Sequence, residues 1–232
     1  MQKNQSLYNT TQILFNHARA MKFFFSAINL GCSKNLVDLE YAVGQILGGA
    51  NSENDVRFFD DPEDKNAQHI IINTCGFLSS SRDEAESTIR YYDNLGKKII
   101  LMGCYIPVRD DSFLNSLKNL YKIIPQKESE NINKELFGHD EKALLKQKVQ
   151  NFKESKLKDY LQNLDRLETD KKAFIWSAKS TRLPFNSPYG HEFVKIAEGC
   201  NNRCSFCIIP KIRGDQRSRP IDDIIEEIKT LV

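Results

Sequence analysis

Residues 69–104 read HIIINTCGFLSSSRDEAESTIRYYDNLGKKIILMGC, and this stretch decides the fold of the chain. Two continuous apolar runs of strand length, His69–Asn73 and Lys98–Met102, lie on either side of a helical stretch, Ser81–Leu95. Strands that are apolar throughout are buried on both faces, as in a parallel sheet with helices on each side. The stretch therefore predicts one β-α-β unit of an open parallel sheet.

The same alternation continues on both sides of this unit. A second helix is expected at Leu36–Leu47, where apolar residues recur at helical spacing. The helix at Ser81–Leu95 opens on a capping box, Ser81-x-x-Glu84, and stops at Gly96. Further strands are predicted at Phe23–Ile28, Val56–Phe59 and Leu120–Ile124. The expected fold class is α/β, with an open parallel sheet in the N-terminal part.

Composition excludes several classes of protein. The 232 residues are 40% hydrophobic and 28% charged, as in a globular protein, and a formal net charge of +2 does not indicate bulk polyanion binding. No apolar run approaches the roughly 20 residues that a membrane span requires. The first residues lack the continuous apolar segment of a secretory signal. We therefore expect a cytoplasmic protein, in whose compartment cysteines bind metals or react more often than they pair.

The chain is expected to divide into an extension at 1–20, an α/β domain at 21–125, a charged helical connector and linker at 126–190, and a new unit at 191–232. Met21 is an alternative start, because the first strongly apolar strand follows it. The new unit has a strand at Glu192–Ala197, a cysteine loop and a helix at Ile221–Val232. One strand, one loop and one helix predict the beginning of a longer, incomplete domain.

Three of the six cysteines share one loop, as Cys200-x3-Cys204-x2-Cys207. Three thiolates on one loop suit three irons of a cubane cluster and leave the fourth iron open. A zinc site would need a fourth soft ligand, and neither cysteine nor histidine follows the loop. A disulfide would leave one cysteine over. The aromatic Phe206 precedes the third cysteine and is expected to pack against the cluster.

The other three cysteines, Cys32, Cys75 and Cys104, each follow a predicted strand and lie beside a glycine. The carboxyl ends of parallel strands meet at one edge of a sheet, where ligands bind. These residues are therefore expected to converge as three ligands of a second cluster. The alternative is three unrelated buried cysteines, since free cysteine is often buried.

Together these motifs resemble the radical S-adenosylmethionine methylthiotransferase family, over Met21–Pro125 and Phe193–Val232. The resemblance implies an α/β domain followed by a TIM-like barrel, of which this chain holds only the first β/α unit. The motif Gly31-Cys-Ser-Lys-Asn35 is similar to the branch that modifies an aspartate of ribosomal protein S12. The branch that modifies an adenosine of tRNA has Gln-Met in place of Ser33-Lys34.

The resemblance also implies the cofactors and the chemistry. Two 4Fe–4S clusters would be held, one by Cys32, Cys75 and Cys104, and the other by Cys200, Cys204 and Cys207. One S-adenosylmethionine would methylate sulfur at the first cluster. A second would be cleaved at the other cluster, where Phe206 would lie on the side that binds S-adenosylmethionine. The resulting radical would take hydrogen from the β-carbon of the S12 aspartate. A sulfur donor and an electron donor are further implied partners, and no catalytic residue beyond the cluster ligands is identified.

Two alternatives remain at this point: the tRNA branch, and a non-enzymatic iron–sulfur module for binding or electron transfer. Because most of the barrel is missing, we expect the chain as it stands to be inactive. Basic residues surround the second thiol loop and indicate either contact with an anionic cofactor or ribosomal partner, or an ordinary basic loop: Arg203, Lys211, Arg213, Arg217 and Arg219. The four histidines are isolated and are expected to be structural or exposed: His17, His69, His139 and His191.

Overall fold

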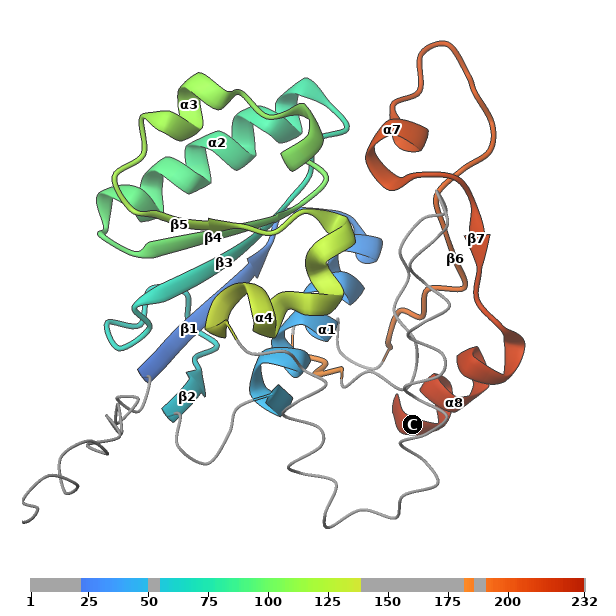
Figure 1. The fold of residues 1–232 in the computed structure, drawn as a ribbon, viewed down its shortest axis with the longest axis horizontal. Coiled ribbons are helices and arrows are strands. Elements are labelled where there is room, and N and C mark those ends of the chain that lie inside the picture. Colours follow the sequence, from blue (N-terminus) through green and yellow to red (C-terminus); the bar gives the residue numbers. More distant parts are fainter. Residues whose placement is uncertain (1–21, 50–54, 139–181, 186–190, 232) are drawn as a thin grey trace, which may run out of the picture.

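A five-stranded parallel sheet, in the order β2-β1-β3-β4-β5, forms the centre of the computed structural model (Figure 1). The structure describes residues 22–49, 55–138, 182–185 and 191–231. The strands are β1 Lys22–Asn29, β2 Asp55–Phe58, β3 His69–Thr74, β4 Lys98–Gly103 and β5 Leu120–Ile123. The five predicted strands and the α/β fold class are therefore confirmed.

Helices cover both faces of the sheet. One face carries α1 Ser33–Gly49 and α4 Ile132–Phe137, and the other carries α2 Ser79–Asn94 and α3 Asp111–Asn115 (Figure 1). Two short 3₁₀ helices, η1 Ile106–Val108 and η2 Gln126–Asn131, follow β4 and β5. The helix expected at Leu36–Leu47 is α1, with about one more turn at its N-terminal end.

The capping box predicted at Ser81 is wrong. Helix α2 begins at Ser79, its N-cap is Leu78, and no side chain caps it. The amide of Arg82 already donates to the carbonyl of Leu78, so Ser81 lies within the first turn instead of preceding it. The helix ends at Asn94, just ahead of Gly96, close to the expected position.

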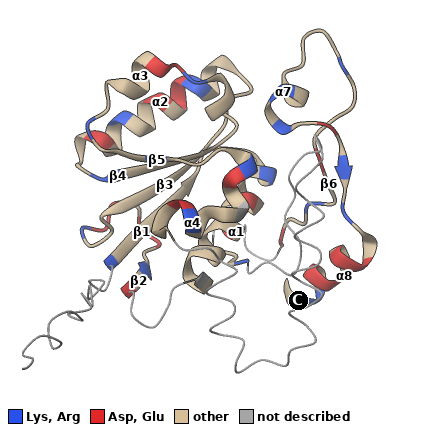
Figure 2. Ribbon diagram, viewed as in Figure 1, with Lys and Arg blue, Asp and Glu red and all other residues tan. Residues whose placement is uncertain are grey.

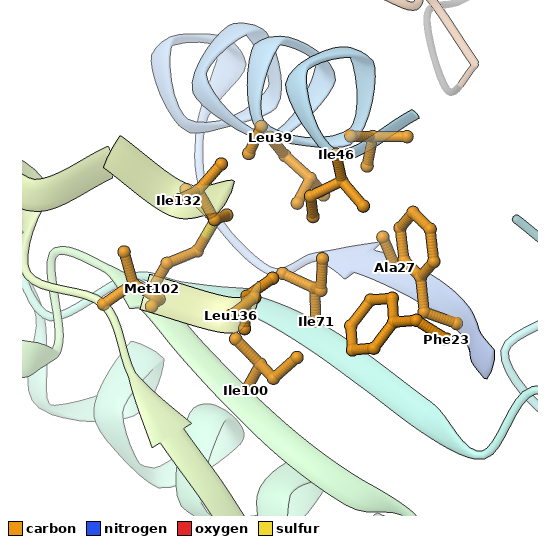
Figure 3. Packing of buried hydrophobic residues seen from close by; sticks show 13 residues of the cluster. Phe23, Ala27, Leu39, Ile46, Ile71, Ile100, Met102, Ile132 and Leu136 are labelled. Atoms are coloured by element: carbon orange, nitrogen blue, oxygen red, sulfur yellow. The ribbon is translucent and has the colours of Figure 1, made fainter. Parts of the chain in front are cut away.

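Alternate residues of the central strands enter two separate hydrophobic cores. Ile71 and Ile100 pack beneath α1 and α4, whereas Ile70 and Ile72 pack against α2 and α3. Figure 3 shows the first core, in which Leu39 and Ile46 of α1 descend onto the sheet. Burial on both faces explains why the strands are apolar throughout rather than alternating.

The α/β unit extends past residue 125. Ile132 and Leu136 of α4 are buried in the core beneath α1, so η2 and α4 belong to the sheet unit. Of the rest of the expected connector and linker, 139–190, only residues 182–185 are described, and the expected extension at 1–20 lies outside the described residues. Within the described part, no helix is both long and apolar enough to cross a membrane.

The C-terminal segment has little regular structure before its last helix. It contains β6 Ala197–Glu198, α7 Ile209–Arg213, β7 Arg217–Ser218 and α8 Ile221–Leu231, and β6 pairs antiparallel with β7. Figure 2 shows basic residues on α7 and acidic residues on α8. The helix expected at Ile221–Val232 is observed.

The strand expected at Glu192–Ala197 is wrong, because only Ala197 of that range is in a strand. Instead Lys195 is buried in an ion pair with Asp38 of α1, and Ile196 is 64% exposed. Ion pairing with α1, rather than backbone hydrogen bonding to a neighbouring strand, therefore positions this segment.

Candidate functional site

Three of the six cysteines lie at the carboxyl edge of the sheet. Cys32 follows β1 and directly precedes α1, Cys75 follows β3, and Cys104 follows β4. The register keeps the ends of these three strands level with one another. The structure thus brings the three residues to the edge where ligands of open parallel sheets bind.

Two glycines allow the loops after β3 and β4 to pack directly on each other. A Cβ at Gly76 would lie 2.5 Å from the carbonyl oxygen of Cys104 and 2.7 Å from the Cα of Tyr105. Gly103 has a φ of 99°, and a Cβ there would lie 2.5 Å from the carbonyl oxygen of Thr74. Backbone atoms cannot move aside as a flexible side chain would. Any other residue at either glycine would therefore separate the two cysteine loops.

Asn35, in the first turn of α1, links two of the cysteines. Its Oδ1 lies 3.4 Å from the Sγ of Cys32 and 3.7 Å from the Sγ of Cys104, in a buried position. The Nδ2 of Asn35 donates to the backbone carbonyl of Thr74. The side-chain amide of Asn73 donates to the backbone carbonyl of Asn35. The amide is therefore held from several sides between the loops. Asn35 lies within the sequence motif Gly31-Cys-Ser-Lys-Asn35, but no spacing in the sequence marks it as a contact between two cysteines.

Arg213 of α7 reaches into the same edge from the C-terminal segment. Its Nε lies 3.0 Å from the Sγ of Cys104, and its Nη2 donates to Oδ1 of Asn35 at 2.7 Å. Burial raises the pKa of the Cys104 thiol, and the guanidinium of Arg213 opposes that rise. The guanidinium of Arg213, from a distant part of the chain, is thus within hydrogen-bond distance of the Cys104 thiol.

A buried quartet of charges holds Arg213 in place. Asp38 of α1 accepts from Lys195 at 2.7 Å and from Arg213 at 2.8 Å, and Glu198 pairs with the same two cations. All four side chains are buried, and the half-exposed Lys34 lies 3.7 Å from Glu198 at the rim. Two cations and two anions balance, which removes most of the cost of burying them. We call this group the charge quartet.

A second ion network lies along α1, on residues farther from the cysteines. Arg182 contacts Glu40 of α1 at 2.5 Å and Glu227 of α8 at 2.7 Å. Arg219 pairs with Glu227 and, at 2.7 Å, with Asp223. The backbone of Leu183 also donates to the carbonyl of Glu40. These contacts join α8 and residues 182–183 to α1.

The second set of thiols lies on the loop between β6 and α7. Cys204 is exposed, and Cys200 and Cys207 are partly exposed. The backbone amide of Cys200 donates to the carbonyl of Gly214, which closes the base of the loop, and Cys207 donates to the carbonyl of Cys204. Phe206 is 89% exposed, so in this structure it does not pack on the protein.

Both sets fit an iron–sulfur cluster by donor type. All six cysteines are free thiols, and soft thiolates are the usual ligands of such clusters. At the sheet edge, the glycine contacts also make a cradle that only a residue without a Cβ allows. Among the described residues, however, no group of three or more His, Cys, Asp or Glu side chains is already arranged as a metal site. Each set of thiols therefore shares a loop or a sheet edge, but its members are not gathered around one point.

The basic residues near the second loop divide into two kinds. Arg213 and Arg219 are buried in ion networks, and Arg203 pairs with Asp215 at the surface. Lys211 is exposed on α7 and Arg217 is partly exposed in β7. The two buried arginines are paired within the protein, so the choice between contact with an anionic partner and an ordinary basic loop concerns the residues that are exposed or partly exposed.

The histidines behave as expected where they are described. His69 is buried at the start of β3 between the rings of Phe23 and Tyr121, and burial lowers its pKa to about 4. His191 packs edge-on against Phe193. The other two, His17 and His139, lie outside the described residues.

Comparison with known proteins matches two parts of the chain. Residues 24–124 match the uncharacterized protein family UPF0004, and residues 194–232 match the radical SAM superfamily. The chain is 36% identical over 211 residues to the ribosomal protein uS12 methylthiotransferase RimO of Caldicellulosiruptor saccharolyticus, covering 88% of this chain and 41% of that protein. It is 32% identical to the same-named protein of Chlamydia pneumoniae and 33% identical to that of Aquifex aeolicus, covering 38% and 37% of their lengths.

By these matches the chain is similar to the radical SAM methylthiotransferases, and to their uS12 branch. These relatives carry the name of the branch expected from Ser33-Lys34. The chain spans about two fifths of the length of the curated methylthiotransferases that it matches. The two matched segments are also the two that carry the thiol sets.

Proposed function

We propose that the protein carrying this chain transfers a methylthio group to the β-carbon of an aspartate of ribosomal protein S12. The reaction would use S-adenosylmethionine and two 4Fe–4S clusters, together with a sulfur donor and an electron donor. We assign it to the cytoplasm, because reducing compartments keep thiols available for metal binding. The barrel that residues 191–232 begin would hold the remainder of the site.

The observation that carries this proposal is the contact between the two segments that bear the thiol sets. Arg213 lies six residues after Cys207 and places its guanidinium 3.0 Å from Cys104 at the sheet edge. A reaction that makes a radical at one cluster and supplies sulfur from another needs both within reach of one substrate carbon. A chain with two unrelated metal sites would have no need for this contact.

The chain's own residues would have three tasks. Cys32, Cys75 and Cys104 would hold one cluster at the sheet edge, and the Cys200–Cys207 loop would hold the other. When bound, the clusters and S-adenosylmethionine would supply the methyl group and the radical. The charge quartet would keep α7 against the sheet edge, and the exposed ring of Phe206 offers an aromatic surface beside the second thiol set.

The test uses the full-length protein, reconstituted with iron and sulfide and mixed with S12, S-adenosylmethionine, added sulfide as the sulfur donor, and dithionite as the electron donor. We expect mass spectrometry to find a methylthio group in place of one hydrogen on an S12 aspartate, together with 5′-deoxyadenosine. The variant Cys204→Ala should lose both products. Cys104→Ala should still form 5′-deoxyadenosine but no modified S12, and the exposed Ser205→Ala serves as a control with both products.

Each alternative predicts a different result in the same assay. Label that enters an adenosine of tRNA instead of S12 would favour the tRNA branch. Clusters that bind and are reduced without any 5′-deoxyadenosine would favour a non-enzymatic iron–sulfur module. Either result would overturn the proposed reaction.

A further inference from the structure

We infer that Arg213 is a positioning residue that donates its Nε–H to the Cys104 thiolate and so raises the reduction potential of the cluster held at the sheet edge. The inference rests on the proposed function only in taking Cys104 as a cluster ligand. It concerns a property of the first cluster that no step of the proposed reaction fixes.

The first argument is the geometry of the guanidinium. Its Nε lies 3.0 Å from the Sγ of Cys104, and the remaining nitrogens are occupied by Asn35, Asp38 and Glu198. These contacts use the planar fork of arginine in several directions at once, which a lysine ammonium cannot do. The orientation of Nε toward sulfur is therefore fixed by the other partners.

The second argument is the surrounding charge. Burial of the charge quartet leaves little water to screen the arginine from the sulfur. Hydrogen bonds to cluster sulfurs, together with net charge and solvent exposure, set the potentials of iron–sulfur clusters. A donor and a cation beside the ligand stabilise the reduced cluster, which carries one more negative charge. Removing Arg213 would also leave the quartet with one cation for two anions, which shifts the potential in the same direction.

The third argument is the placement of the donor on a different segment from the ligands. Arg213 is on α7, within the segment that holds the second thiol set, whereas Cys104 belongs to the sheet unit. The potential of the first cluster would therefore depend on whether α7 is docked. A cluster that is easier to reduce only in the docked arrangement would link electron acceptance to the assembled site.

The experiment measures the midpoint potential of the first cluster alone. Replacing Cys200, Cys204 and Cys207 by alanine in the full-length protein leaves one cluster, which is titrated anaerobically with dithionite and followed by electron paramagnetic resonance. Each cluster takes one electron from dithionite, from its 2+ to its 1+ state, and no bond forms or breaks. We expect Arg213→Met to shift the midpoint to a more negative value, and Arg213→Lys to lie between it and the parent.

Two further variants separate the inferred role from simpler ones. Lys211→Met removes the same charge from an exposed position on the same helix, where solvent screens it, and should leave the potential unchanged. Lys195→Met weakens the quartet without touching Cys104, and its shift should be clearly smaller than that of Arg213→Met. An equal shift in Lys195→Met would overturn the inference, because docking alone would then account for it.

Failure of the inference and failure of the proposed function give different results. A cluster that forms with the same midpoint in Arg213→Met and in the parent overturns the role of Arg213 and leaves the transferase proposal intact. If the parent with only Cys32, Cys75 and Cys104 binds no iron, the assignment of these ligands is overturned, and the inference with it.

Discussion

Replacing Asp38 by asparagine would remove the carboxylate that joins both cations of the charge quartet. Its two oxygens lie 2.7 Å from Nζ of Lys195 and 2.8 Å from Nη1 of Arg213, and all three side chains are buried. Burial raises the pKa of Asp38, but the two cations lower it by more, so the group is ionised with a pKa below its ordinary value. Asparagine keeps the volume of the side chain and removes its charge.

The expected loss of stability is large. Removing one partner of a buried ion pair costs about 3–5 kcal/mol, because the remaining charge stays buried without compensation. Asp38 serves two cations, so we expect the upper half of that range, about 4–5 kcal/mol. Asp55 is the matched control: its carboxylate lies 2.8 Å from Arg57 in a comparable ion pair, but at the surface. Exposed pairs contribute about 0–1 kcal/mol, so Asp55→Asn should change little.

Urea unfolding followed by circular dichroism at pH 7 measures the global loss. Hydrogen exchange of the α7 amides then shows whether the loss is concentrated where α7 meets the sheet edge. We expect these amides to lose protection in Asp38→Asn and to keep it in Asp55→Asn. A loss in Asp38→Asn no larger than in the control would refute the reasoning, because the quartet would then not hold the two segments together.

Three further predictions follow from other parts of the structure. Gly103→Ala should cost about 1–3 kcal/mol more than Gly96→Ala in urea unfolding, because both have positive φ but only Gly103 is crowded by backbone; equal costs would contradict the close packing of the loops. His69 has a pKa lowered to about 4, below its ordinary 6.5, so it stays neutral when the unfolded chain gains a proton. The unfolding free energy should therefore fall by roughly 2 kcal/mol from pH 6.5 to pH 4 through this group, and His69→Gln should lack that component of the pH profile. Glu227→Ile should cost about 3–5 kcal/mol, since two buried arginines lose the carboxylate that they share. Ile225→Glu, on the exposed side of α8, should change stability by about 0.5 kcal/mol or less; the reverse order would show that the helix is turned the other way.

The sheet unit could be predicted from sequence because its signals are local. His69–Thr74 and Lys98–Gly103 contain the uninterrupted apolar runs Ile70–Ile72 and Ile99–Met102, and such short runs are typical of a strand buried on both faces. Once the strands are known to be parallel, their carboxyl ends share an edge, so the meeting of Cys32, Cys75 and Cys104 at one edge follows from topology alone.

The contacts of the C-terminal segment could not be predicted in the same way. The pair of Arg213 and Cys104 joins residues 109 positions apart, and no periodic pattern marks either as a partner of the other. On α8 the pattern was misleading. By spacing its isoleucines lie on one helical face, yet Glu227 is buried and Ile221 is 74% exposed. Two arginines made that carboxylate the better residue to bury, which hydrophobic spacing does not reveal.

Helix α1 shows why the two segments meet through charges. Its apolar residues, such as Leu39 and Val43, face the sheet, while Asp38 and Glu40 pair with cations from the C-terminal segment. Apolar side chains on this side of α1 would hold the C-terminal segment as strongly. They would let the segment slide along the helix, because hydrophobic contact is not directional. A guanidinium that donates hydrogen bonds to two carboxylates fits only one arrangement of the three groups. The buried charges therefore specify where α7 lies more than they stabilise it, and that position is what brings Arg213 to Cys104.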